Sequence, residues 1–200
     1  KETFLPLTQV NVQTQITPTF AVEAQYYLDW DNTRAPEGGT YLGSADFGVD
    51  GPDQLGYLGS AFPNLKRLPN YEPGDDIGDW GVKLQFNPDF LQGHTVGVYY
   101  REFTEKAPWF TVKPDISGYR FSYNEGAKLA GLSYDGSVGA VAVGAEVGYH
   151  MDVALKTPSF SITDEGARGD TWHSLVNAIY LLPNIGIWDT GTVAAELSYD

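Results

Sequence analysis

The 200-residue sequence contains no cysteine, a single methionine and no long apolar run. Without cysteine the chain cannot form disulfides, thiolate metal sites or a thiol nucleophile. Its apolar runs fall far short of the roughly 18 residues that a membrane-spanning helix needs, and its first residues show no signal-peptide pattern. These absences exclude helical insertion into a membrane. They leave open crossing by β-strands, which needs only about 9 to 11 residues with every second one apolar.

Basic residues are also scarce, with 12 lysines and arginines against 26 acidic residues and a formal net charge of -14. Such a chain repels phosphate, so we expect no nucleic-acid partner. The three histidines (His94, His150 and His173) are far apart and form no metal-binding motif. Phosphate-binding loops and dinucleotide fingerprints are absent as well. The sequence therefore predicts no cofactor, no metal site and no catalytic residues.

Glycine and aromatic residues are abundant, with 23 glycines, 13 tyrosines, 10 phenylalanines and 5 tryptophans. This composition is typical of strands and turns and excludes a helical bundle. Alternation of apolar and polar residues with period two predicts about eight antiparallel strands in four hairpins. The predicted strands cover residues 9–16, 20–31, 80–86, 96–101, 128–134, 141–150, 172–182 and 193–199. Asp135-Gly136-Ser137 is predicted to be a turn.

The connections between the predicted strands alternate in length. The turns within hairpins are short, whereas the connections at 32–79, 104–126 and 151–170 are long, and all twelve prolines lie in connections or at strand margins. Short turns at one rim and long loops at the other are typical of outer-membrane β-barrels. We therefore expect residues 1–200 to form one β-barrel unit or barrel section, with short periplasmic turns and 32–79 as a long extracellular loop.

The direction in which the apolar side of each strand points decides the class of protein. Aromatic residues near strand ends favour an outward apolar side that meets lipid, with interfacial rings at Trp30, Trp80, Tyr100, Tyr149 and Trp172. The alternative is a soluble β-sandwich or β-barrel that turns the same side inward and binds sugars or lipids. Periodicity alone does not distinguish these two arrangements.

Four stretches resemble a family of Gram-negative outer-membrane proteins known only as a domain of unknown function. That resemblance implies a transmembrane β-barrel in the outer membrane, with a part in moving hydrophobic compounds. Family members are longer, and the chain ends at Ser198-Tyr199-Asp200 without a terminal aromatic residue, so it resembles an internal section of such a protein. The stretches are VEAQYYLDWDNTRAPEGGTYLGSADF (22–47), DWGVKLQFNPDFLQGHTVGVYYREF (79–103), LAGLSYDGSVGAVAVGAEVGYH (129–150) and AIYLLPNIG (178–186).

Charged residues on the polar side of the strands are the candidate functional residues. One hypothesis is a charged constriction in the lumen that selects a solute. The other is an internal ladder of salt bridges, extended by Lys128, that satisfies buried polar groups and fixes the strand register. The candidate lumen-lining residues are Glu23, Lys83, Arg101, Glu146 and Glu196.

The loop at 32–79 and the histidines suggest weaker alternatives. Asp75, Asp76 and Asp79 could hold calcium, but a solvated acidic loop is favoured because their spacing does not match a calcium-binding loop. The pentapeptide Tyr-Leu-Gly-Ser-Ala occurs at 41–45 and at 57–61, and a loop built on it could fold into the lumen. His150 with Asp152 would be the start of an outer-membrane hydrolase. We expect no enzyme activity.

Taken together, the sequence predicts a porin-like channel or transport protein in the outer membrane of a Gram-negative bacterium. Its expected partners are membrane lipids, lipopolysaccharide, a small hydrophobic solute, and further strands from the rest of the protein or another chain. An eight-stranded barrel closed on itself is filled by side chains, so a lumen that holds a solute requires those further strands.

Overall fold

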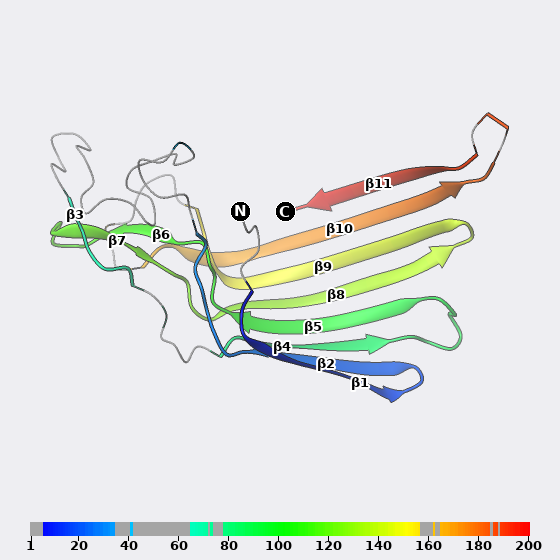
Figure 1. The fold of residues 1–200 in the computed structure, drawn as a ribbon, viewed down its shortest axis with the longest axis horizontal. Coiled ribbons are helices and arrows are strands. Elements are labelled where there is room, and N and C mark those ends of the chain that lie inside the picture. The colour runs from blue at the N-terminus through cyan, green and yellow to red at the C-terminus, as the bar shows by residue number, and fades with distance from the viewer. Residues whose placement is uncertain are drawn as a thin grey trace.

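The computed structural model describes residues 6–34, 41, 65–71, 73, 78–156, 162, 165–184, 186–187 and 189–200. Its main body is one curved, antiparallel sheet of eight strands that follow each other in chain order (Figure 1). This confirms the predicted all-β meander. The strands are β1 (Gln9–Thr17), β2 (Phe20–Tyr27), β4 (Trp80–Phe86), β5 (Thr95–Phe103), β8 (Ala127–Val138), β9 (Val141–Ala154), β10 (Arg168–Leu182) and β11 (Gly191–Tyr199).

The four predicted hairpins are present, as β1–β2, β4–β5, β8–β9 and β10–β11. Their turns all lie at one end of the sheet, and the longer connections lie at the other (Figure 1). None of the prolines in the described part of the chain lies within a strand, since each would leave a ladder hydrogen bond unmade. No helix that could cross a membrane occurs among the described residues.

The turn between β8 and β9 lies later than predicted. Asp135 and Gly136 are inside β8, opposite Gly144 and Val143, and the chain reverses at Gly139, whose φ is +62°. Glycine adopts this left-handed conformation without steric cost. Gly136 has a different role, because a side chain at this position would collide with the ring of His94.

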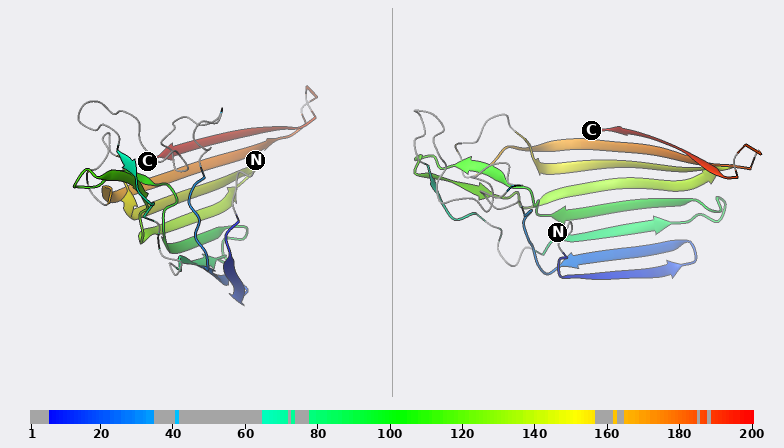
Figure 2. Two further views of the ribbon diagram at one scale, coloured as in Figure 1. Left: turned by 60° about the vertical axis from the view of Figure 1, so that its left-hand side comes forward. Right: turned by 45° about the horizontal axis from the view of Figure 1, so that its top comes forward.

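The eight-stranded sheet is open. Within the described residues, β1 and β11 each pair with one neighbour only and not with each other. Their outer edges therefore carry unpaired backbone groups, which proteins rarely leave exposed along whole strands. The views in Figure 2 show the strands side by side in one curved layer. An open curved meander is consistent with part of a barrel wall.

A second, small sheet lies at the end of the long connections (Figures 1 and 2). It consists of β3 (Lys66–Arg67), β6 (Trp109–Val112) and β7 (Gly118–Ser122), with β3 parallel to β7 and β6 antiparallel to it. We call these three strands the cap sheet. The sequence predicted only long connections at 32–79 and 104–126, where these three strands lie, because strands this short show too little alternation to be detected.

The cap sheet contains the buried hydrophobic cluster of the described chain. Val112 and Tyr119 are completely buried, Leu65 and Phe121 are nearly so, and Phe110 packs against them. The ring of Phe110 stacks on that of Tyr119 at 5.2 Å and meets that of Phe121 edge-on at 5.8 Å. The large sheet, by contrast, has no comparable dry core among the described residues.

Candidate functional site

One face of the large sheet is apolar on every strand except at its end near the long connections, where Glu102 lies opposite Lys128. Lys128, expected on the polar side, therefore lies on this side, because it alternates in step with Ala130 and Leu132. Cross-strand pairing places Val22 opposite Leu84, Leu84 opposite Val98, and Leu132 opposite Val147, so alternate residues share this side. We call it the apolar face. It comprises Val10, Val12, Phe20, Val22, Ala24, Tyr26, Trp80, Val82, Leu84, Phe86, Val96, Val98, Tyr100, Ala130, Leu132, Tyr134, Val143, Ala145, Val147, Tyr149, Trp172, Val176, Ala178, Tyr180, Val193, Ala195, Leu197 and Tyr199.

The apolar face is uncovered. Val98 is 51% exposed, Leu132 48% and Leu197 76%, in strands spread across the whole sheet. Single exposed apolar residues are normal, but a continuous apolar surface across eight strands indicates an apolar environment or a partner. In a soluble sandwich these side chains would form a dry centre, which the described structure does not contain.

Aromatic residues gather near both ends of the apolar face. Towards the long connections, the rings of Trp80 and Tyr100 lie 5.5 Å apart and those of Tyr149 and Trp172 lie 4.5 Å apart. A second group lies towards the short turns and comprises Phe20, Phe86, Tyr134 and Tyr180.

The two aromatic groups are separated by a charge-free stretch of strand. Trp80 and Phe86 are six positions apart in β4, which corresponds to about 20 Å along the strand. Trp30, predicted as an interfacial ring, lies beyond the end of β2 and meets Tyr123 edge-on at 4.8 Å. The other four predicted interfacial aromatics are on the apolar face.

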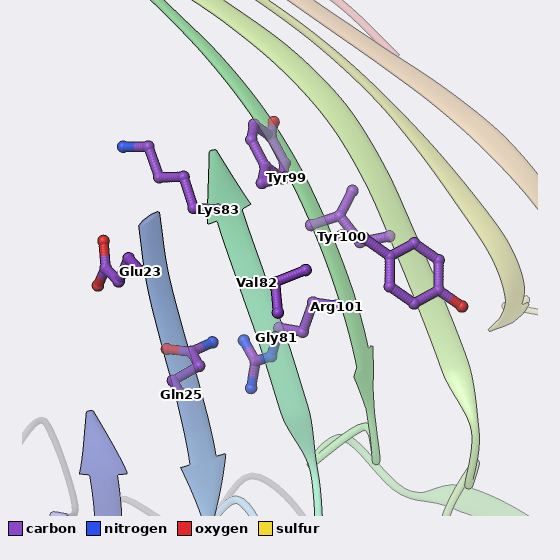
Figure 3. Close-up of a pocket in the computed structure, with 9 residues that line it drawn as sticks. Glu23, Gln25, Gly81, Val82, Lys83, Tyr99, Tyr100 and Arg101 are labelled. Carbon is purple, nitrogen blue, oxygen red and sulfur yellow. The ribbon is translucent and has the colours of Figure 1, made fainter. Parts of the chain in front are cut away.

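The opposite side, the polar face, carries all five predicted lumen-lining residues. Register places Glu23 opposite Lys83 and Gly81 opposite Arg101, whereas Glu196 lies opposite Asn177 near the other edge of the sheet. Glu23, Lys83 and Arg101 therefore lie on three adjacent strands, with the charged ends of Lys83 and Arg101 pointing apart (Figure 3). Glu146 is two strands further on, and Glu196 is remote from the group.

The predicted ladder of salt bridges does not form among the described residues. Glu23 accepts a hydrogen bond of 3.0 Å from the Nδ2 group of Asn11, on the strand away from Lys83. Lys83 leans the other way, towards β5. Its Cε lies 3.4 Å from the position that a Cβ at Gly97 would occupy. Within the described part of the chain, the ammonium group of Lys83 makes neither an ion pair nor a hydrogen bond.

Arg101 is held by aromatic rings instead of carboxylates. Its guanidinium lies 5.2 Å from the ring centre of Tyr27 and 4.9 Å from that of Phe103, as in cation–π contacts. Its Nε is buried and has no hydrogen-bond partner among the described residues. The guanidinium thus retains unused donors.

Glu146 is bound by a residue that the sequence did not single out. The hydroxyl of Tyr99 donates to Oε1 of Glu146, and the tyrosine ring lies across Gly131 on the intervening strand. Glycines at 81, 97, 144 and 148 lie on the same face and likewise have neighbouring side chains over them. In the sequence, glycines at polar-side positions of the strands were the signal that neighbouring side chains could cross the backbone there.

A cavity of about 170 Å³ opens on the polar face between β2, β4, β5 and β8. Gly81 forms part of its floor, where a Cβ would lie 3.0 Å from Nε2 of Gln25 and 3.4 Å from Cγ of Arg101. Six side chains line the cavity from the polar face, and all of them except Leu129 are labelled in Figure 3. They are Glu23, Gln25, Lys83, Tyr99, Arg101 and Leu129.

Among the described residues, the structure brings together neither the predicted calcium ligands nor the predicted hydrolase pair of His150 and Asp152. Asp79 accepts two hydrogen bonds of 3.0 Å from the backbone N–H of Thr104, whereas Asp75, Asp76 and nearly all of both pentapeptides lie outside the described residues. His150 has no hydrogen bond to Asp152 within the described chain, and no cluster there could hold a metal ion. The backbone N–H of Asp152 donates instead to Asp170, at 3.1 Å.

These features define a class of protein: an open antiparallel β-meander with one uncovered apolar face and one polar face that holds a charged cavity. The chain belongs to the family described as Protein of unknown function (DUF1302), whose model matches residues 1–200. This confirms the predicted membership of a family of unknown function. No curated protein and no solved structure matches the chain.

Proposed function

We propose that this chain forms part of the wall of a β-barrel in the outer membrane of a Gram-negative bacterium, and that the barrel passes a small hydrophobic solute. In this arrangement the apolar face contacts lipid and the polar face lines the lumen. The membrane lipids, lipopolysaccharide and the strands that complete the barrel are then its partners.

The observation that carries the proposal is the uncovered apolar face. Leu84, Val98 and Val147 are 43%, 51% and 37% exposed on three different strands. In water, exposure on this scale favours aggregation, whereas in lipid it is the ordinary state of a barrel wall. The aromatic groups at both ends match the rings that barrels place at the two membrane surfaces.

The polar face supports passage of a solute that is not fully hydrophilic. Leu129 borders the cavity, and Leu175 and Ile179 lie on the same side of β10 among polar residues. Alternation of charged and apolar side chains along one surface offers a molecule with an apolar body several places to rest. These apolar side chains support a solute with an apolar part.

Spin labelling tests the orientation of the sheet, and because residues 1–200 contain no cysteine, cysteines introduced there are the labelling sites in this part of the protein. Cysteines are introduced one at a time at Leu84 and Val98 on the apolar face, and at Gln85 and Ser133 on the polar face. The full-length protein is labelled with a nitroxide and reconstituted in lipid. We expect labels at 84 and 98 to collide mainly with oxygen, and labels at 85 and 133 mainly with a water-soluble nickel chelate.

The result that would reject the membrane assignment is equally specific. Labels at 84 and 98 that collide freely with the nickel chelate would place the apolar face in water or at a loose protein contact. Labels protected from both oxygen and nickel would instead indicate the dry centre of a soluble domain. Solute passage is measured separately, as faster uptake of the hydrophobic dye N-phenyl-1-naphthylamine by cells that produce the protein.

A further inference from the structure

The lining of the cavity on the polar face carries two cations and one carboxylate. Arg101 and Lys83 both line it, and neither forms an ion pair among the described residues. Glu23 is the one carboxylate in the lining, and it is bound by Asn11 on the far side of β2. A locally cationic site in a chain of net charge -14 favours a negatively charged ligand.

The donors available to a ligand are of the kind that recognise a carboxylate. A guanidinium and an ammonium form short, charge-assisted hydrogen bonds to carboxylate oxygens. The Nε of Arg101 is buried and has no partner within the described chain, and a buried donor left unpaired is costly. A bound anion that reaches this guanidinium would remove that cost.

The rest of the cavity is suited to an apolar body of limited size. Tyr99 and Leu129 contribute a ring and an aliphatic side chain, and Gly81 keeps the floor open. The volume of about 170 Å³ is close to the roughly 150 Å³ of a cavity known to accept benzene. A single aromatic ring therefore fits, whereas a long acyl chain would extend out of the cavity.

We propose that this cavity binds a small carboxylate whose apolar body is about one aromatic ring in size, with Arg101 holding the carboxylate and Tyr99 and Leu129 contacting the ring. The ammonium group of Lys83, which leans towards Gly97, adds attractive charge at longer range. The inference deepens the proposed function, because it assigns a solute class to the face that would line the lumen. Binding itself requires only that this face is in contact with water.

The test is binding of 4-fluorobenzoate to the full-length protein in detergent, followed by fluorine NMR. We expect saturable binding, with benzyl alcohol and benzylamine competing at least about tenfold more weakly than benzoate because they lack the carboxylate. Equal competition by benzyl alcohol would overturn the proposal. Tighter competition by decanoate than by benzoate would overturn the size assigned to the ligand.

Variants separate recognition from folding. Arg101→Gln should weaken binding about tenfold or more and Lys83→Gln by about twofold to fivefold, while Lys128→Gln, which removes a cation outside the cavity, should leave it unchanged. Glu23→Gln should strengthen binding, by about twofold to fivefold, because it removes the competing negative charge. A misfolded protein cannot give this gain. Unchanged affinity in Lys83→Gln, Arg101→Gln and Glu23→Gln would reject the site.

Failure of this proposal and failure of the proposed function are distinguishable. Spin labels that report lipid at Leu84 together with no benzoate binding would retain the barrel wall and reject the ligand. Benzoate binding together with nickel access at Leu84 would retain the ligand site and reject the membrane orientation.

Discussion

The ring of Tyr99 lies over the backbone of Gly131, and its hydroxyl donates a hydrogen bond to Glu146 on the next strand. One side chain thus spans three strands, β5, β8 and β9, on the polar face. The contact depends on the missing side chain at 131, because a Cβ there would collide with the tyrosine ring. The size of the residue at position 131 on β8 thereby decides whether the hydroxyl of Tyr99 on β5 reaches the carboxylate of Glu146 on β9.

Replacement of Gly131 by alanine should displace Tyr99 and break its hydrogen bond to Glu146. We expect Gly131→Ala to be less stable than Gly148→Ala by about 1–2 kcal/mol. Gly148 is the matched control because it lies directly opposite Gly131, and a Cβ there would lie 3.4 Å from Leu129 without severe overlap. The measurement is urea unfolding of the full-length protein in detergent.

The mechanism of this effect is tested by a double substitution. In a Tyr99→Leu background, Gly131→Ala should cost much less, because the ring that it displaces is already gone. An equal cost in both backgrounds would show that the destabilisation comes from the β8 backbone and not from the position of Tyr99.

A charge on the apolar face should be far more damaging than the same charge on the polar face. Leu84→Lys should destabilise the protein in lipid by about 2–4 kcal/mol if position 84 is near the middle of the membrane. Gln85→Lys, one residue away on the opposite face, should cost less than about 1 kcal/mol. Unfolding titrations in lipid vesicles compare the two, and equal costs would contradict the assignment of the faces.

The large sheet could be predicted because each of its strands repeats one simple pattern. From Trp80 to Phe86, for example, apolar and polar residues alternate without exception, and the pairing register follows from keeping the two faces separate. Leu129 interrupts the pattern in β8, and the structure gives the reason: it lies on the polar face beside the cavity. The interruption marks the border of the cavity and not the end of a strand.

The cap sheet and the cavity could not be predicted in the same way. β3 consists of two residues whose partners, Gly118 and Tyr119, lie some fifty positions later in the chain, so no local pattern announces the pairing. The cavity likewise depends on how far Glu23 and Lys83 lean apart, which alternation does not specify. Sequence placed the charged residues on one face, and only side-chain packing shows which of them remain unpaired.

Asn124 joins the connection between β5 and β8 to the end of β9. It is completely buried, and its Nδ2 donates 2.6 Å hydrogen bonds to Oε2 of Glu105 and to the carbonyl oxygen of Asp152. The same carboxylate oxygen of Glu105 accepts a 2.6 Å hydrogen bond from the backbone N–H of Ala154. These contacts tie the segment that carries β6 and β7 to the large sheet.

Asn124→Ala should therefore loosen this junction and cost about 1–3 kcal/mol, since it removes both hydrogen bonds donated by a completely buried side chain. Hydrogen exchange at the backbone amides of Glu105 and Ala154 should accelerate, while exchange in the centre of β4 should not change. Glu125→Ala alters the neighbouring exposed side chain and serves as the control. Unchanged exchange at both amides would mean that Asn124 does not hold the junction.

The turn between β6 and β7 provides a titratable group outside the proposed membrane-spanning segments. Oδ1 of Asp115 accepts hydrogen bonds from the hydroxyl and the backbone N–H of Ser117, at 2.7 and 3.0 Å. These bonds, the hydroxyl first, lower the pKa of Asp115 below its ordinary value because they favour the charged carboxylate. The contribution to stability is present above the pKa of the unfolded chain and is lost as pH falls through the folded pKa.

Ser117→Ala removes the larger of the two hydrogen bonds and should raise the pKa of Asp115 towards its ordinary value, without reaching it because the backbone N–H remains. Carbon-13 NMR of the Asp115 carboxyl group during a pH titration measures the midpoint directly. Ser137→Ala, which changes an exposed serine in β8, should leave that midpoint where it is. An equal midpoint in Ser117→Ala and the unmodified protein would show that the hydroxyl does not stabilise the carboxylate, and the acid dependence of the turn would then rest on the backbone hydrogen bond.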